Sequence, residues 1–392
     1  MRKKPRLLWI ISFHHACNDG TLMALVALLP ILVKEMDLSY YEVGLLGFGL
    51  LITVVVQYMV GRFADRSFSR YLLEVGAFLM GVTFVLMLFI NDFTGLFLAV
   101  ISMRLGAAFY HPVGISWITK EYAGEYLDTA LGVQSGVGNF GVIIALGTSG
   151  FLGEFLTWKA PCVLWAGLNF AAVLMGVVMI SKEHAPATQT AAPKMMSPLG
   201  TARKMWVLIL PIISGGALYQ ITTYFGPIKL TKVNDWSAGN ADLAFAIWIA
   251  VGTITSYYFG VMSVRFGKKR LLAAGYLASL LAILVMALTA EWFIITPALV
   301  IYGAFLFTTY PTLFSYVTEV TEPGERATAF GILFGFQLGG GAVFVYLSGI
   351  VAELLESPDY AFYVGAALSA ASLVTILLIR DTKINNKHTG RA

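Results

Sequence analysis

Apolar stretches of about twenty residues follow one another along the whole 392-residue chain. The runs at 7–33, 44–60, 273–288 and 362–379 are typical. A helix rises about 1.5 Å per residue, so about twenty residues cross the roughly 30 Å of hydrocarbon in a bilayer. Only 12% of the residues are charged, whereas soluble domains carry about 25%. The sequence therefore predicts an all-α membrane protein.

Twelve transmembrane helices are predicted, in two halves of six. We place the spans at 7–33, 42–60, 71–90, 95–119, 128–153, 159–180, 205–230, 242–262, 271–290, 293–318, 327–350 and 360–379. Residues 1–180 form the first six-helix bundle, and 205–392 form the second bundle with a cytoplasmic tail. Between them, 181–204 is rich in Ala, Pro and Thr, which favours a flexible cytoplasmic linker.

The two halves repeat one another without a gap. A shift of 199 residues lays Pro112 on Pro311, and the same shift pairs Ser116 with Ser315, Thr119 with Thr318, Gly132 with Gly331 and Gly136 with Gly335. A parallel repeat of six spans is an architecture of alternating-access carriers, in which the solute site lies near the midplane between the halves. The repeat therefore favours a carrier over a simple membrane anchor.

The basic residues predict which way the chain crosses the membrane. With both termini in the cytoplasm, all but five of the 26 Lys and Arg lie on the cytoplasmic side, as the positive-inside rule expects. Because these charges are spread over many loops, they do not indicate nucleic-acid binding. We expect an integral protein of the prokaryotic cytoplasmic (inner) membrane, a monomer whose surroundings are the lipid bilayer.

The loop between the second and third spans, from Gly61 to Arg70, reads Gly-Arg-Phe-Ala-Asp-Arg-Ser-Phe-Ser-Arg. It resembles the signature loop of the major facilitator superfamily, Gly-x-x-x-Asp-Arg followed by a basic cluster. The resemblance implies the twelve-helix major facilitator fold. It also implies that Asp65, with Arg66 and Arg70 as partners and Arg326 on the facing surface, latches the cytoplasmic gate while the carrier is open outward. A carboxylate beside Arg is favourable on electrostatic grounds alone.

A narrower resemblance, to the fosmidomycin-resistance branch of this superfamily, rests on four segments. They are His-Ala-Cys-Asn-Asp at 15–19, Phe-Tyr-His-Pro at 109–112, Gln-Ser-Gly-Val-Gly-Asn-Phe-Gly at 134–141 and Phe-Gly-Phe-Gln-Leu-Gly-Gly-Gly at 334–341. Members of that branch are regarded as proton-driven drug exporters, so the resemblance implies proton-coupled efflux. Val113 and Arg104 depart from the branch's pattern, and the exported drug class is therefore not carried over.

Charged and polar side chains inside the spans are candidates for function, because each is costly in hydrocarbon unless it is paired or wetted. Asp19 and Arg104 both fall near the midplane. We predict that Arg104 holds an anionic group of the solute and that Asp19, released from Arg104, binds the coupling proton. His15 and His111 complete the polar stripes and are expected to relay protons, and Asn18, next to Asp19, is a further candidate for this site. In the alternative, Asp19 and Arg104 form a fixed structural pair.

Aromatic and amide side chains of the second half are expected to contact the solute through hydrogen bonds and stacking. These cavity-wall candidates are Tyr219, Gln220, Tyr224, Trp248, Tyr302, Tyr310 and Gln337. Protonation chemistry on one half and a neutral wall on the other would suit a small amphipathic molecule or organic anion.

The sequence thus favours a secondary active transporter that exchanges a small organic solute or drug for protons. No Gly-x-x-x-x-Gly-Lys-Ser/Thr phosphate-binding loop occurs, and we expect neither an enzyme nor a resident cofactor or metal. Two alternatives stay open. One is a solute sensor on a transporter fold, which would bind solute without net flux. The other is a carrier of divalent metal ions, because His and Asp are acceptable metal ligands.

Overall fold

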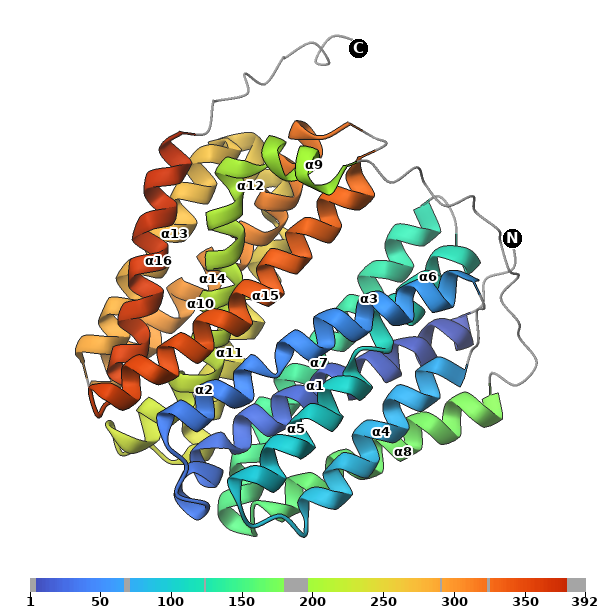
Figure 1. Cartoon of the computed structure of the whole chain (residues 1–392), viewed down its shortest axis with the longest axis vertical. Helices are drawn as coiled ribbons and strands as arrows, with labels where there is room; N and C mark the ends of the chain where they lie inside the picture. Colours follow the sequence, from blue (N-terminus) through green and yellow to red (C-terminus); the bar gives the residue numbers. More distant parts are fainter. Residues whose placement is uncertain are drawn as a thin grey trace.

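Helices make up nearly all of the structure, a computed structural model that describes residues 5–66, 71–122, 125–179, 197–289, 291–322 and 325–378. No strand occurs within these ranges. The first half, blue to green in Figure 1, contains α1 (Pro5–Glu35), α2 (Tyr40–Phe48), α3 (Leu50–Arg66), α4 (Tyr71–Met87), α5 (Phe93–Ala107), α6 (Tyr110–Glu121), α7 (Glu125–Phe155) and α8 (Lys159–Met179). The second half contains α9 (Pro198–Lys204), α10 (Trp206–Lys232), α11 (Ala238–Tyr257), α12 (Phe259–Phe266), α13 (Lys268–Leu288), α14 (Trp292–Val320), α15 (Arg326–Leu354) and α16 (Asp359–Leu377).

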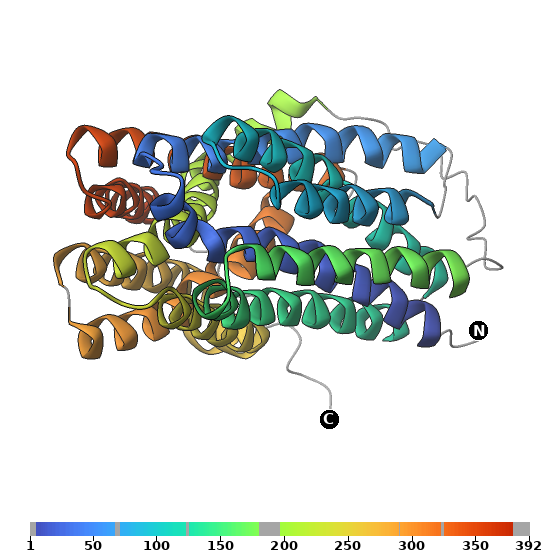
Figure 2. The same cartoon turned by 90° about the horizontal axis from the view of Figure 1, so that it is seen from below.

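Eleven helical stretches of the described residues are long and apolar enough to cross a membrane, and the shorter apolar helix α4 stands where the third span was expected. Many helices of the first half run side by side along one direction in Figure 2. Helices satisfy every backbone hydrogen bond within one segment, which hydrocarbon demands of a spanning chain. The prediction of an all-α membrane protein with twelve spans is confirmed.

Three of the twelve spans are each built from two helices. The second span breaks at Gly49, the fourth at Ala108 and Phe109, and the eighth at Tyr258. In the fourth span the cause lies in the sequence, because the ring of Pro112 clashes with the carbonyl group four residues earlier, that of Ala108. The break ends α5 just after Arg104 and restarts the chain as α6 at Tyr110.

The end of the predicted linker is ordered as the short helix α9. Residues 181–196 of that linker lie outside the described residues, whereas Pro198–Lys204 is helical. Ser197 begins the helix by accepting a hydrogen bond from the backbone N–H of Gly200. Lys204 then donates hydrogen bonds to both carboxylate oxygens of Glu325, at 2.8 and 2.7 Å. This ion pair tethers α9 to the start of α15.

The two halves stand apart near α9. On α7, a Cβ added at Gly132 or Gly136 would meet no atom within 4 Å, and the same holds for Gly331 and Gly335 on α15. In Figure 1 the ribbons of α3 and α15 diverge toward α6 and α9. We call this end of the bundle the α9 end, and the opposite end, where α2 and α11 begin, the far end.

At the far end the two halves are packed backbone to backbone. A Cβ on Gly150 of α7 would lie 2.9 Å from the carbonyl oxygen of Ala238 in α11, and one on Gly349 of α15 would lie 2.6 Å from that of Tyr40 in α2. We call these contacts the α7–α11 seam and the α2–α15 seam. Since both seams are closed while the α9 end is apart, the conformation is open toward the α9 end alone.

We expect Gly349→Val to open the far end. The added side chain would meet backbone atoms, which cannot rotate away, and such overpacking costs about 1–3 kcal/mol. The ratio of open to closed far ends should therefore rise by about 5- to 150-fold. Distances between spin labels at Tyr41 and Leu355, across the α2–α15 seam, would report the change. Gly335→Val is the matched control, since its side chain enters open space, and an equal effect of both variants would contradict the assignment.

The ion pair that tethers α9 should weaken as the pH falls into the acid range. The hydrogen bonds from Lys204 lower the pKa of Glu325, and those to Glu325 raise the pKa of Lys204. A lowered acid pKa adds stability above the group's ordinary value of 4.5, and this stability is lost as pH falls through the lowered pKa. The protection of the α9 amides against hydrogen exchange, relative to an unstructured chain at the same pH, should thus be constant from about pH 5 upward. It should fall in stronger acid. Lys204→Gln should remove that protection at every pH; unchanged protection would contradict the tether.

Candidate functional site

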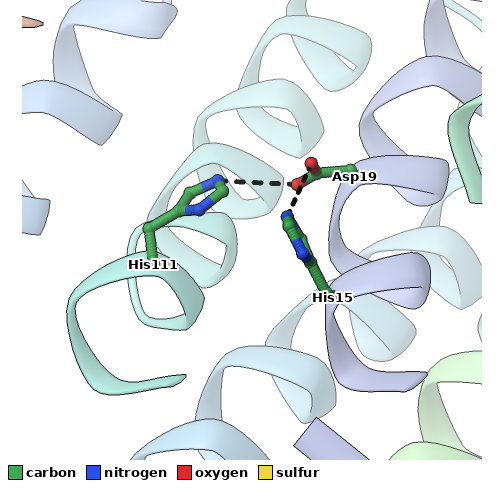
Figure 3. A group of neighbouring side chains, drawn as sticks. All are labelled: His15, Asp19 and His111. Atoms are coloured by element: carbon green, nitrogen blue, oxygen red, sulfur yellow. Dashed lines mark ion pairs between the residues drawn. The ribbon is translucent and has the colours of Figure 1, made fainter. Parts of the chain in front are cut away.

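Asp19 of α1 lies between two imidazole rings (Figure 3). The Nε2 atom of His15, one helical turn earlier, is 3.0 Å from Asp19 Oδ2, and Nε2 of His111, near the start of α6, is 3.6 Å from Oδ1. Asn18 donates a hydrogen bond of 2.8 Å from Nδ2 to Oδ1. The structure thus brings together four of the five residues expected to bind proton and solute. We call His15, Asp19 and His111 the His–Asp cluster.

His15 is held in place by helices α6 and α7. Its ring stacks on Tyr110 with centroids 4.4 Å apart, and its Nδ1 atom lies 2.9 Å from the backbone carbonyl oxygen of Gln134. Tyr110 in turn donates a hydrogen bond of 2.8 Å to the Gln134 side chain. A Cβ at Gly138 would lie 2.5 Å from the His15 ring, so α7 can approach the ring this closely because that residue is glycine.

The contacts of His15 determine how many protons the cluster holds. A carbonyl oxygen only accepts hydrogen bonds, so Nδ1 of His15 carries a hydrogen toward Gln134. If His15 were neutral, its Nε2 would then present a lone pair to the Asp19 carboxylate at 3.0 Å, and the two would repel. One further proton, on His15 or on Asp19, would make this close contact favourable.

Arg104 does not pair with Asp19 in this conformation. No ion pair within 4.0 Å joins Arg104 to any carboxylate of the described residues. Instead it donates a hydrogen bond of 2.7 Å to the hydroxyl of Tyr224, on α10 of the second half. The expected salt bridge is thus replaced: His111 contacts Asp19, and Arg104 contacts Tyr224 of the other half. Arg104 itself is buried, and its Nε atom has no hydrogen-bond partner among the described residues.

The seven cavity-wall candidates differ in what surrounds them. Trp248 and Tyr302 are fully buried and stack on each other with centroids 5.4 Å apart, so in this conformation they belong to the packed core of the second half. Tyr224 contacts Arg104 directly. Near these residues lie the partly exposed Tyr219, Tyr310 and Gln337 and the largely buried Gln220. The tyrosine next to Arg104 is thus the member most directly tied to the polar site.

The predicted cytoplasmic latch falls mostly outside what the structure describes. Gly61, Asp65 and Arg66 lie in the last turns of α3, but the side chains of the latter two are not described, and Arg70 lies outside the described residues. Arg326 is exposed at the first position of α15. The latch therefore stays a prediction from the resemblance.

Tyr110 and Gln134 contact His15, but the sequence motifs that contain them gave no reason to expect this. Each is a polar residue within an apolar span, and that signal is available from sequence. Which ring Tyr110 stacks on, and which carbonyl His15 reaches, depend on how α1, α6 and α7 are packed together.

The His–Asp cluster can perform two kinds of chemistry. It can take up and release a proton, as the contacts of His15 indicate. It also offers three ligand atoms, one from each residue, all within 4.8 Å of one another. Two imidazoles and a carboxylate are suitable ligands for a divalent transition-metal ion.

Comparison with known proteins places the chain in a protein family. A family model described as the Major Facilitator Superfamily matches residues 8–320 and, in a second match, 225–392. The chain is 24% identical to the uncharacterized MFS-type transporter YfnC of Bacillus subtilis (strain 168), over 98% of this chain and 95% of that protein. It is 23% identical to the fosmidomycin resistance protein of Escherichia coli (strain K12), over 95% and 92%. Among solved structures, the nucleoside transporter NupG superposes with a TM-score of 0.80 at 18% identity, over 96% of this chain and 98% of that one.

The two histidines of the cluster should differ in their importance for stability. His15→Ala removes a stacked ring and its hydrogen bond to the Gln134 carbonyl oxygen, at a cost of about 2–4 kcal/mol. His111 is more exposed, so His111→Ala should cost about 1 kcal/mol or less. A thiol-reactive dye reports unfolding here, because Cys17 and Cys162 are both free and buried. An equal fall in the melting midpoint of both variants would contradict this account of the site.

Proposed function

The chain belongs to the major facilitator superfamily of membrane transporters, and from that membership we propose that it moves a small organic solute by alternating access in exchange for protons. The observation that carries the proposal is the approach of His15 Nε2 to within 3.0 Å of Asp19 Oδ2, a contact that favours an extra proton on the pair. Asp19 lies in the middle of α1, where an ionisable group is costly unless it has a function or a partner.

Arg104 supplies the other argument for the proposal, which concerns the solute. It is a buried cation whose only described partner is the neutral hydroxyl of Tyr224. A buried charge without a counter-ion is destabilising, so the site favours a solute that brings a negative group. Because Tyr224 belongs to the second half, such a solute would contact both halves at once. That position is where alternating-access carriers bind their substrates.

The sign of the coupling depends on which group the solute meets. An anion that met only Arg104 would add negative charge near Asp19 and draw a proton onto it, which gives cotransport. A solute that also donates hydrogen bonds to Asp19 competes with the proton and gives exchange. We favour exchange, because the side chains of His111 and Asp19 are 36% and 22% exposed and a solute can reach the acid itself. The likeness to a fosmidomycin resistance protein agrees with export.

The orientation follows from the distribution of basic residues. We propose that the α9 end faces the cytoplasm of a prokaryote, with the chain in the inner membrane, because all but five of the 26 Lys and Arg lie on that side. In that orientation the structure is the inward-open conformation, in which an exported solute would load.

Two rival functions remain distinguishable by experiment. The ligand geometry of the His–Asp cluster favours a divalent metal ion as a second candidate substrate. A solute sensor with the same fold would bind solute but carry none across the membrane.

The test is proton movement in sealed proteoliposomes that contain a pH-sensitive dye. Gradients of organic anions, phosphonates, lipophilic drugs or divalent metal ions are imposed on the wild type and on Asp19→Asn. In exchange, protons move against the direction of the solute, and we expect Asp19→Asn to reduce this flux by at least about a hundredfold, the scale on which a positioned proton-transfer group acts. Asp37→Asn is the matched control, because Asp37 has a φ of 51°, which Asn readily adopts.

Each other outcome has a defined meaning. Protons that move together with the solute would show cotransport and overturn the exchange. Binding without flux in any protein would favour the sensor, and flux with metal ions alone would favour the metal carrier. Flux that survives Asp19→Asn would reduce Asp19 to a structural residue.

A further inference from the structure

Each seam at the far end is closed by a glutamate from one half that caps a helix of the other. Glu154 of α7 accepts hydrogen bonds from the backbone N–H groups of Ala238 and Gly239, at 2.7 and 3.1 Å, where α11 begins. Glu353 of α15 accepts a hydrogen bond of 2.8 Å from the N–H of Tyr40, where α2 begins. The two glutamates are related by the 199-residue repeat. Carboxylates are favourable at helix N-termini, so the two seams are built alike.

One buried position breaks this symmetry. Asp242, in the second turn of α11, corresponds through the repeat to Val43 of α2. Both side chains are 0% exposed. Because a valine fills the position in the α2–α15 seam, packing of such a seam does not require a carboxylate. The sequence placed the start of the eighth span at 242, at the membrane edge, whereas α11 begins at Ala238 and buries this acid one turn inside.

The Asp242 carboxyl group is enclosed without a partner. A Cβ at Gly150 of α7 would lie only 2.2 Å from Oδ2, so the group is pressed against the backbone of the opposite half. Neither oxygen has a hydrogen-bond partner among the described residues. Among the helices packed against α11, the charged group that acts on Asp242 is the carboxylate of Glu154.

The other charged groups near the far end are engaged or exposed. Lys229 of α10 is paired with Asp359, and Lys232 lies over the ring of Tyr40. On the remaining neighbours, Lys34 and Glu35 end α1 and Glu291 precedes α14, all three exposed. An ionised Asp242 would therefore be a second negative charge beside Glu154, buried without a counter-ion, which is among the costliest arrangements in a protein interior.

We propose that Asp242 is a second proton-binding site, which permits the α7–α11 seam to close only when its carboxyl group carries a proton. On closure, one proton passes from the solution at the far end to the Asp242 carboxylate. On opening, the group meets water again and the proton returns to that solution. The inference rests on the proposed alternating access and orientation, and it is independent of Asp19.

Spin labels at Leu156 and Asn240, which are exposed on either side of the α7–α11 seam, measure its opening in lipid nanodiscs as pH is raised. If closure binds one proton, the ratio of open to closed seams rises by up to about tenfold per pH unit in the wild type. Asp242→Asn should remove this slope and keep the seam closed at every pH. Asp242→Val, which copies the other seam, should do the same and serves if the asparagine variant does not fold.

Glu154 is the other acid that could titrate in this seam, and Glu154→Gln separates the two. This variant should weaken closure at all pH values and keep the slope. A wild-type ratio that does not change with pH, or a slope that survives in both Asp242 variants, would overturn the proposal. A slope lost in Glu154→Gln would assign the proton to Glu154 instead.

A parallel measurement on Asp19→Asn separates this inference from the proposed function. In one outcome, the seam keeps its pH slope in Asp19→Asn while solute-driven flux in proteoliposomes does not need Asp19. In that case the proposed coupling fails, and the proton-dependent closure at Asp242 stands. If flux needs Asp19 and both Asp242 variants keep the pH slope, the proposed coupling stands and the inference about Asp242 fails.

Discussion

Hydrocarbon leaves a polar group no solvent partner, and the arrangement of this protein follows from that single cost. The backbone meets it by being helical almost throughout the described residues. The side chains meet it in different ways. Lys229, almost fully buried, is paired with Asp359. Asp19 lies 3.0 Å from Nε2 of His15. Arg104 has only a tyrosine hydroxyl, and Asp242 has no partner among the described residues. The groups left least satisfied are those to which we assign solute and proton binding.

The break in the fourth span connects local sequence to this chemistry. Pro112 interrupts the helical hydrogen bonding, so that α5 ends at Ala107 and α6 begins at Tyr110. Arg104 lies before this break and His111 lies after it. The imidazole contacts Asp19 within the first half, and the guanidinium reaches Tyr224 in the second. The residue assigned to proton binding, His111, and the residue that contacts the other half, Arg104, are thus only seven positions apart in one span.

The repeat provides a common skeleton, and departures from it provide the function. Both seams use a glutamate cap and a glycine that allows backbones to meet, at positions related by the same shift. The His–Asp cluster occurs in the first half alone among the described residues, and the buried acid Asp242 occurs in one seam alone. A closed far end therefore depends on symmetric packing, while its response to protons is carried by one side.

The sequence by itself determined the twelve spans, the two related halves and the identity of the polar residues within the membrane, because apolar length and the cost of buried charge are properties of the chain. It also placed Asn18 and His15 beside Asp19, since residues one and four apart on a helix stay close in any fold. It could not decide that Asp19 meets His111 rather than Arg104, or that Asp242 is sealed against Gly150. Those pairings depend on where helices break and how they pack across the two halves, which only the tertiary structure fixes.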